Sequence, residues 1–183
     1  MDLVRPAPPY IASYSDALRR GWSPDNTRDA AAAEELQMIV QDATQFLESL
    51  TDTDAKGPPV RLPDGSVVPR LPGFRLWMWD GEFCGSIGFR WQVGTSELPA
   101  YCLGHIGYAV VPWKRQRGYA TRALGLMLPM ARERGLAHVD LSTDPENIPS
   151  QRVILANGGV FQGRFHKTAH YAGAEGFLYR IYL

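Results

Sequence analysis

The sequence has no excess of either charge and no long apolar run. Its 183 residues include 19 Lys and Arg against 19 Asp and Glu, so the formal net charge is zero. Proteins that bind nucleic acid or a membrane surface usually carry a basic excess. We therefore expect no nucleic acid and no membrane among the partners. No stretch of about 18 apolar residues occurs, which argues against a membrane-spanning helix.

Cysteine is also scarce. Cys84 and Cys102 are the only two, and neither has a second cysteine at zinc-site spacing. Residues 1–10 lack the basic stretch and apolar core of a secretory leader. These absences predict a cytoplasmic protein without a metal site. Three histidines without ligand spacing fit the same expectation: His138, His166 and His170.

The length and composition predict one globular domain. Hydrophobic residues make up 45% of the chain and charged residues 21%, which is ordinary globular usage. We divide the domain into a helical part at 1–50, a proline-rich loop at 51–73 and a core at 74–183. In the first part a single helix is expected over Ala30 to Leu50, because apolar residues recur at spacings of four, three and four. Those residues are Leu36, Val40, Ala43 and Leu47.

The pattern after the proline-rich loop changes to that of strands. Alternating residues from Phe74 to Trp79 predict a strand, and Asp80-Gly81 predicts a hairpin turn. Within the loop, Asp64-Gly65 predicts a second turn. The remaining expected strands are Glu82 to Arg90, Gly104 to Val111, His138 to Leu141, Val160 to Phe165 and Phe177 to Tyr182. The expected helices are Gly118 to Arg134 and Pro149 to Ala156.

The junction between the third of these strands and its helix has the features of an anion site. A loop that turns into a helix presents unpaired N–H groups and the positive end of the helix dipole. Gly118 leaves room for close approach, and Arg115 and Arg117 add positive charge, so a diphosphate fits this chemistry. The alternative is that Gly118 merely permits a tight turn beside solvated arginines.

Two well-known nucleotide motifs are missing, and a third pattern is present. Neither G-x-G-x-x-G nor G-x-x-x-x-G-K-[ST] occurs, which disfavours a dinucleotide-binding oxidoreductase. The chain instead has R-x-x-G-x-A after a strand that ends in Val-Val-Pro. Further on, Asn147 is followed by Ser150, a helix and the pair Gly158-Gly159. Together these motifs resemble the two cofactor motifs of the GNAT superfamily of acetyl-CoA-dependent N-acetyltransferases, over about Phe74 to Leu183.

The resemblance implies an α/β (α+β) fold with a mixed, mostly antiparallel sheet splayed near Val110 to Pro112. Acetyl-CoA would enter the splay as co-substrate, its pantetheine arm pairing with the backbone of Val110 and Val111. The pyrophosphate would lie on the loop that follows. Asn147 would hydrogen-bond the pantetheine, although Asn147 also suits a helix N-cap. The loop residues implied in cofactor binding are Arg115, Gln116, Arg117, Gly118, Tyr119, Ala120 and Thr121.

One departure from the family pattern concerns the proton donor. Many members place a Tyr seven residues after the Asn, where this chain has Ile154. The branch that acetylates protein N-termini, including those of ribosomal proteins, also has an aliphatic residue there, with a Ser three residues after the Asn. The resemblance to this branch implies that Ser150 lies near the thiol and assists its departure. That branch reads Glu-Ile-Gly-Tyr on a strand that here reads His105-Ile-Gly-Tyr108.

His105 would then stand where a carboxylate base is expected. Deprotonating an alkyl ammonium at pH 7 costs about 4.6 kcal/mol, and an imidazole could accept the proton directly or through water. The sequence therefore predicts His105 and Ser150 as catalytic residues. The alternative for His105 is a structural strand histidine. A non-catalytic acyl-CoA-binding regulatory module is the alternative function, and Ile154 is the feature that favours it.

The acceptor is defined only as an amine, on a small molecule, a peptide or a protein. We expect the proline-rich loop at 51–73 to lie beside the acceptor mouth. Oligomeric state is open, with a homodimer among the states that the sequence allows. Four aromatic residues could line the acceptor pocket or simply belong to the core: Trp77, Trp79, Trp91 and Tyr171.

Overall fold

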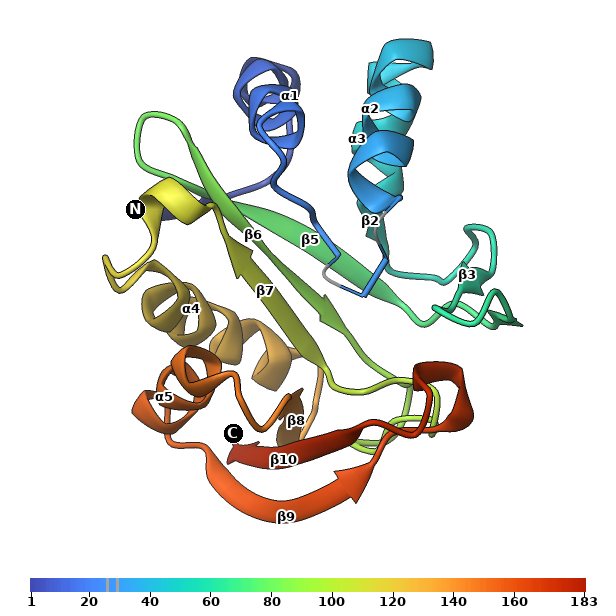
Figure 1. Cartoon of the computed structure of the whole chain (residues 1–183), viewed down its shortest axis with the longest axis vertical. Helices are drawn as coiled ribbons and strands as arrows, with labels where there is room; N and C mark the ends of the chain where they lie inside the picture. Colours follow the sequence, from blue (N-terminus) through green and yellow to red (C-terminus); the bar gives the residue numbers. More distant parts are fainter. Residues whose placement is uncertain (26, 29) are drawn as a thin grey trace.

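A computed structural model describes residues 1–25, 27–28 and 30–183 (Figure 1). The helices are α1 (Ile11–Arg19), α2 (Ala31–Gln41), α3 (Ala43–Ser49), α4 (Tyr119–Glu133) and α5 (Ile148–Ala156). The strands are β1 (Asp2–Val4), β2 (Thr51–Asp52), β3 (Val60–Arg61), β4 (Val67–Val68), β5 (Gly73–Trp79), β6 (Phe83–Arg90), β7 (Ile106–Val110), β8 (His138–Thr143), β9 (Val160–His166) and β10 (Glu175–Tyr182). Short 3-10 turns lie at Pro8–Tyr10, Pro112–Lys114 and Ala169–Tyr171.

The strands form two main antiparallel sheets. The first has the order β1-β5-β6-β7, with β2 also paired to β5, and the second has the order β8-β10-β9. A small hairpin of β3 and β4 stands apart, closed at the Asp64-Gly65 turn. The predicted mixed fold with a mostly antiparallel sheet is confirmed. The strand between Asp2 and Val4 was not expected from the sequence.

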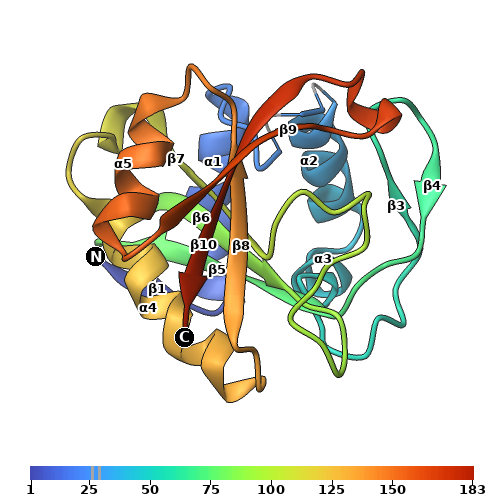
Figure 2. The ribbon, with the colours of Figure 1, turned by 90° about the horizontal axis from the view of Figure 1, so that it is seen from below.

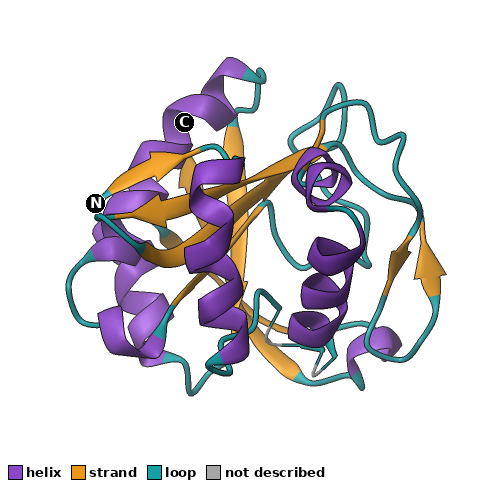
Figure 3. Ribbon diagram, turned by 90° about the horizontal axis from the view of Figure 1, so that it is seen from above, coloured by secondary structure: helices purple, strands orange, loops and turns teal. Residues whose placement is uncertain are grey.

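Helices cover the first sheet on both faces (Figures 1 and 3). On one face α4 buries Leu124 and Met127 against Ile87 and Phe89, in a core that extends to β8 and β10. On the other face the N-terminal helices pack on Trp77. Removal of this apolar area from water is the main driving force for both layers. The first sheet is therefore a platform held between two cores.

The two sheets meet at one point, where β7 and β8 begin to run side by side. There the main-chain N–H of His105 donates to the Asp140 carbonyl at 2.8 Å, and the Asp140 N–H donates to Nδ1 of His105 at 2.9 Å. Beyond this point β7 is the edge of one sheet and β8 the edge of the other. We call the space between these two edges the wedge. The predicted splay is confirmed, and it opens from His105 toward Val110.

The single helix expected over Ala30 to Leu50 is wrong. Asp42 has an extended backbone (φ −157°) and its carboxylate accepts from the N–H of Gln45 at 2.9 Å, so it caps a new helix, α3. Because of this break, the four apolar residues no longer share one helix face, and Val40 is 80% exposed. Leu36 and Leu47 do pack against the N-terminal core as expected. An N-cap aspartate ends one helix and begins another, which the regular spacing of apolar residues does not show.

Candidate active site

The loop between β7 and α4 has the geometry of an anion-binding turn. Gln116 (φ 62°) and Gly118 (φ 72°) both adopt left-handed backbone conformations. The first bond of α4 runs from the Arg122 N–H to the Gly118 carbonyl at 3.0 Å. The N–H groups of Tyr119–Thr121 therefore precede the helix ladder and point out of its N-terminus. The loop from 115 to 118 is exposed. This matches the expected loop-to-helix form, while the pyrophosphate itself stays a prediction.

Asp80, at the β5–β6 turn, stabilises the two ends of this loop through hydrogen bonds. Lys114 donates through Nζ to Asp80 at 3.1 Å and to Glu82 at 2.6 Å, and the Tyr119 hydroxyl donates to Asp80. Burial opposes ionisation of Asp80, but hydrogen bonds from Cys84, Tyr119 and Lys114 outweigh it and hold its pKa at about 2. Asp80 is thus a fixed anion under the loop. The sequence predicts only a turn at Asp80, because nothing local links this residue to a loop more than 30 residues away.

The open edge of β7 is made by alternate residues. Val111 donates its N–H to the Cys84 carbonyl at 2.9 Å, toward β6. Because hydrogen bonding alternates along an antiparallel strand, the backbone groups of Tyr108 and Val110 face the wedge instead. Val110 there accepts a long bond of 3.4 Å from Nε of Arg115. Of the two predicted pantetheine contacts, Val110 is on the open edge, whereas the Val111 N–H is already paired.

On the opposite side of the wedge, α5 begins with an N-cap. The Asn147 Oδ1 atom accepts from the Ser150 N–H at 3.2 Å, so the expected capping role of Asn147 is confirmed. The Ser150 hydroxyl lies 2.9 Å from the Tyr108 hydroxyl, which links α5 to β7 across the wedge. Burial raises the pKa of Tyr108 to about 12, so its phenol stays protonated at neutral pH. Ile154, at the position of the family's Tyr, is 1% exposed.

A cavity of about 360 Å³ connects the wedge to the face of the sheet below the N-terminal helices. Tyr108, Asn147, Ser150 and Ile154 line its wedge end. Its other end is lined by the proline-rich loop, by β6, by Tyr171 and by four residues that follow α1: Pro24, Asp25, Thr27 and Arg28. A second cavity of about 380 Å³ shares part of this lining, including Arg75, Arg90 and Tyr171. We call the two together, beyond the wedge, the acceptor cleft.

The proline-rich loop lines this cleft, and its place beside the acceptor mouth stays a prediction. Val60 and Leu62 line both cavities, and Pro69 and Arg70 line the second. Asp64 accepts from His170 at 2.9 Å, which ties the tip of the loop to the segment after β9. Figure 2 shows the β3–β4 hairpin beside that segment. The loop is therefore part of the cleft wall.

A buried polar network supports the floor of the cleft. Arg75 donates to Glu35 at 2.8 Å and to the Tyr14 hydroxyl at 3.4 Å, and Tyr14 donates to Glu35. Burial disfavours the charge on Arg75, but Glu35 and Tyr14 more than compensate and raise the pKa of Arg75. Burial likewise raises the pKa of Tyr14. The network joins α1, α2 and β5 into one rigid wall.

The structure brings Ser150 into the cavity but does not place His105 there. His105 is 0% exposed, does not line either cavity, and uses Nδ1 to accept from the Asp140 N–H. Burial lowers its pKa to about 4, so the ring is neutral at pH 7. These surroundings fit the structural alternative. The catalytic role stays a prediction, which the substitutions below test.

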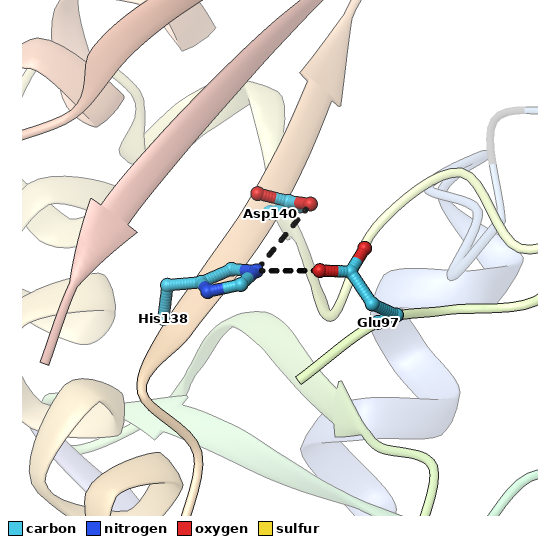
Figure 4. Close-up of side chains that lie close together, drawn as sticks. All are labelled: Glu97, His138 and Asp140. Carbon is cyan, nitrogen blue, oxygen red and sulfur yellow. Dashed lines mark ion pairs between the residues drawn. The ribbon is translucent and has the colours of Figure 1, made fainter. Parts of the chain in front are cut away.

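One group of potential metal ligands lies outside the cleft. Ligand atoms of Glu97, His138 and Asp140 fall within 4.8 Å of one another (Figure 4). His138 approaches Glu97 at 3.7 Å and Asp140 at 3.9 Å through Nε2. Arg180 already holds Asp140 with two bonds of 2.8 Å, in the fork geometry typical of a guanidinium and a carboxylate. The group is thus an ion-pair network, and we assign no metal to it.

The aromatic and cysteine candidates divide into core residues and cavity residues. Trp77 and Trp91 are buried core residues, whereas Tyr171 lines both cavities. Cys84 is buried, and burial raises the pKa of its thiol to about 12, as for a small apolar filler. Cys102 lines the second cavity. Of the four aromatic candidates, Tyr171 is therefore the one at the cleft.

The family of the chain follows from a direct sequence comparison. The model of the acetyltransferase (GNAT) domain matches residues 7–160, more than four fifths of the chain. The chain belongs to the GNAT acetyltransferase family, whose co-substrate is acetyl-CoA. The match begins well before Phe74, so the N-terminal helices belong to the same domain pattern as the core. The resemblance seen in the two motifs was therefore shorter than the true relationship.

Solved structures share the fold over nearly the whole chain. The microcin C7 self-immunity acetyltransferase MccE, in complex with acetyl-CoA and AMP, is 12% identical, with a TM-score of 0.64 over 99% of this chain and 91% of its own. RimJ of Mycobacterium smegmatis, in complex with CoA-disulfide, is 18% identical, with a TM-score of 0.62 over 98% and 80%. Ribosomal-protein-S5-alanine acetyltransferase of Vibrio fischeri is 18% identical, with a TM-score of 0.54 over 94% and 85%.

Two further comparisons gave negative findings. No curated protein sequence matches the chain. Among the described residues, no helix has both the length and the apolar character needed to cross a membrane.

Proposed function

We propose that this protein transfers an acetyl group from acetyl-CoA, held in the wedge, to an amine that enters through the acceptor cleft. One observation carries the proposal: a single cavity of about 360 Å³ is lined at one end by Tyr108 and Ser150 and at the other by residues of the cleft. A thioester and an amine brought together in one cavity react as an intramolecular pair, which removes much of the entropic cost of encounter.

For the cofactor, we propose that the loop from Gln116 to Thr121 holds the pyrophosphate. The left-handed residues at 116 and 118 and the exposed N-terminus of α4 support this assignment. Arg115 and Arg117 add charge at the rim. The pantetheine arm would then run along the open edge of β7, where Val110 presents its backbone, and pass Asn147 on the other side.

For the leaving thiolate, we propose Tyr108 and Ser150 as hydrogen-bond donors. Their hydroxyl oxygens lie 2.9 Å apart in the wedge. Ile154 lines the same cavity but has no hydroxyl that could serve instead. A thiol has a pKa near 8.5, well below the pKa of about 12 of Tyr108, so complete proton transfer from the phenol is uphill. Hydrogen bonding to the developing negative charge needs no complete transfer and still favours the transition state. Tyr108 belongs to the His-Ile-Gly-Tyr segment, whose pattern alone predicts no role for this side chain.

For the amine, we propose that water in the cleft removes the proton. The ring of His105 lies outside the cavity lining, and its pKa of about 4 makes it a weak base. The pH dependence of the rate would then be set by the pKa of the substrate's amine. A rate that rises steadily from pH 7 toward pH 9, with no plateau from an enzyme group near 6 to 7, is the expected profile.

The test of the function combines cofactor binding with turnover. Gly118→Trp places a bulky side chain in the loop at a left-handed position, and Gly135→Trp is the matched control at the other end of α4. Their φ angles are 72° and 79°, and a Cβ at either site meets no atom within 4 Å. We expect Gly118→Trp to lose CoA affinity by about 100-fold or more and Gly135→Trp to keep it. Equal CoA affinity in the two variants would show that the loop is not the pyrophosphate site.

Turnover separates the enzyme from a second candidate function. Ile154, which replaces the family's Tyr and is 1% exposed, favours a module that binds acyl-CoA without catalysis. An enzyme releases free thiol from acetyl-CoA in the presence of a suitable amine. A regulatory module binds acetyl-CoA but releases no thiol across a panel of amino acids, polyamines, aminoglycosides and peptide N-termini.

A further inference from the structure

The acceptor cleft has an excess of positive charge, although the chain as a whole is neutral. Five cationic side chains line the first cavity, against two acidic ones among the described residues. The cations are Arg28, Arg61, Arg75, Arg90 and Lys167, and the acids are Asp25 and Asp144. An ammonium alone would be repelled by such a surface. The charge therefore needs a counterpart on the substrate.

Three of the five cations are already paired. Arg28 is paired with Glu34, Arg75 with Glu35 at 2.8 Å, and Lys167 with Asp144. Asp25 accepts from two neutral groups, the Thr27 N–H at 2.8 Å and the Thr27 hydroxyl, and keeps its negative charge.

The two remaining cations are Arg61 and Arg90. Among the described residues, neither has a carboxylate within 4.0 Å. Arg61 lies on β3 of the proline-rich loop and Arg90 at the end of β6, so they come from two different walls of the first cavity. The cavity is thus lined by two guanidinium groups that have no acidic partner among these residues.

Arg90 extends over a bare part of the sheet. Its Nη2 atom lies 3.5 Å from the position that a Cβ would take on Gly107. Gly107 is paired with Gly88, which is paired with Arg75. Directly opposite residues share a face of the sheet, so two neighbouring positions below Arg90 carry no side chain. The missing side chains let the guanidinium of Arg90 lie close over β7 at Gly107, the residue before Tyr108.

We propose that the acceptor is a small amine that also carries an anionic group, a carboxylate or a phosphate, and that Arg61 and Arg90 bind this group. The inference rests on the proposed function, since it names the substrate class of the same site. Guanidinium groups recognise both anions through paired hydrogen bonds. The anion holds the substrate on the cleft floor and directs its amine toward the wedge. A peptide N-terminus without such a group makes no use of these two side chains.

The first experiment measures anion binding without turnover. The protein is saturated with CoA, so that the cofactor loop is occupied, and titrated by calorimetry with inorganic phosphate and, separately, with malonate. We expect wild type and Arg132→Gln to bind at least one of them, and Arg61→Gln/Arg90→Gln to lose at least about tenfold in affinity. Arg132 is the matched control because it is exposed on α4 and lines neither cavity. The anion that binds distinguishes a phosphate site from a carboxylate site.

The second experiment measures acceptor choice by thiol release from acetyl-CoA. Each pair of amines compares a member that carries an anionic group with one that does not: β-alanine against β-alaninamide, and phosphoethanolamine against ethanolamine. We expect the anionic member of a pair to have the higher kcat/KM by about tenfold, and the ratio to approach one in the double variant while CoA affinity stays unchanged.

Failure of this inference and failure of the proposed function give different results. Equal anion affinity in wild type and the double variant, or no anion binding in either, overturns the anion site whether or not an amine is acetylated. A preference for neutral peptide N-termini that survives the double substitution also overturns it. Loss of the proposed function is seen separately, as CoA that fails to bind or thiol that is never released.

Discussion

The wedge and the acceptor cleft are built in different ways. On the cofactor side, the candidate contacts are backbone groups: the open edge of β7 and the N–H groups that lead into α4. On the acceptor side they are side chains from distant segments, such as Arg61 and Arg90. A site made of backbone groups requires particular residues only where φ is positive or where space is limited. These few positions lie close together in the sequence and form a recognisable motif. A side-chain site assembled from several segments leaves none.

Because of this difference, substitutions should affect the wedge and the acceptor cleft in different ways. A backbone site resists most substitutions and fails when its conformation changes, as at Gly118. A side-chain site fails one contact at a time and can be retuned by changing single residues. We expect substitutions in the wedge to act on CoA affinity or on kcat, and substitutions in the cleft to act on the acceptor KM.

The largest predicted effect is on the chemical step, through the hydroxyl pair of the wedge. Tyr108→Phe should lower kcat by about 10-fold to 100-fold, because a hydrogen bond to a developing charge contributes about 1.5–3 kcal/mol. CoA affinity should change little. Thiol release under saturating acetyl-CoA and acceptor measures kcat. Ser150→Ala should give a smaller loss on the same scale.

Tyr101→Phe is the matched control for Tyr108→Phe. Tyr101 lines the second cavity, not the wedge, and its hydroxyl donates to the Pro69 carbonyl at 3.0 Å. It should keep its kcat. Equal rates in the Tyr101 and Tyr108 variants would mean that the Tyr108 hydroxyl does not assist the leaving thiolate.

The next effect concerns His105, which joins the two halves where the sheets meet. His105→Ala leaves the buried Asp140 N–H without its acceptor, so we expect a loss of about 1–3 kcal/mol in the free energy of unfolding. His105→Asn retains an acceptor at the position of Nδ1 and should lose less. Urea unfolding at pH 7 measures both. If His105 were the base, both variants would instead lose kcat by about 100-fold while their unfolding free energies stayed close to wild type.

The pH dependence of stability gives an independent check on His105. Its pKa is lowered from 6.5 to about 4 by burial, so between these values the unfolded chain binds a proton that the folded chain does not. The contribution of His105 to stability is therefore complete above pH 6.5 and is lost as the pH falls toward 4. Urea unfolding at pH 7, 5.5 and 4.5 should show a steeper decline for wild type than for His105→Asn. Parallel declines would mean that His105 does not have this lowered pKa.

A moderate effect is expected under the cofactor loop. Asp80→Ala removes the anion that holds Lys114 and Tyr119, so the loop should lose its preorganised form and CoA affinity should fall by about tenfold. Calorimetry with CoA measures the change. Glu82→Ala is a milder variant, because Glu82 contacts Lys114 but is half exposed. If Asp80→Ala changed the acceptor KM more than the CoA affinity, Asp80 would support acceptor binding and not the cofactor loop.

The smallest effect is expected at the rim of the cleft. His170→Ala releases the tip of the proline-rich loop from Asp64, and we expect the acceptor KM to rise by a few fold without a change in CoA affinity. His166→Ala, an exposed histidine on β9 that lines neither cavity, is the matched control. Steady-state kinetics with one acceptor are sufficient. A change in CoA affinity alone would show that this loop serves the cofactor instead.

The contrast between the two halves explains what could be predicted from the sequence. Helix α4 was expected from Gly118 to Arg134 and runs from Tyr119 to Glu133, because a left-handed glycine marks each end. The N-cap at Asn147 was likewise readable. These are local signals, and they lie in the cofactor half.

Long-range signals were missed. The role of Asp80 under the loop depends on a tertiary contact with Lys114, which no spacing rule shows. Arg61 on β3 and Arg90 on β6 are far apart in the sequence, and only the tertiary structure shows that both line one cavity. The burial of His105 also depends on tertiary packing, since it follows from β8 lying beside its side chain. The sequence pattern alone could not distinguish a base in the cavity from a ring between two sheets.

Amide hydrogen exchange with and without saturating CoA tests directly whether acetyl-CoA binds in the wedge and on the loop before α4. If it does, we expect protection of the N–H groups of Gln116–Thr121 and of Val110 on the open edge of β7, with little change in the β3–β4 hairpin or in β9. Protection confined to the hairpin and the acceptor cleft, with the loop before α4 exchanging as in the free protein, would contradict it.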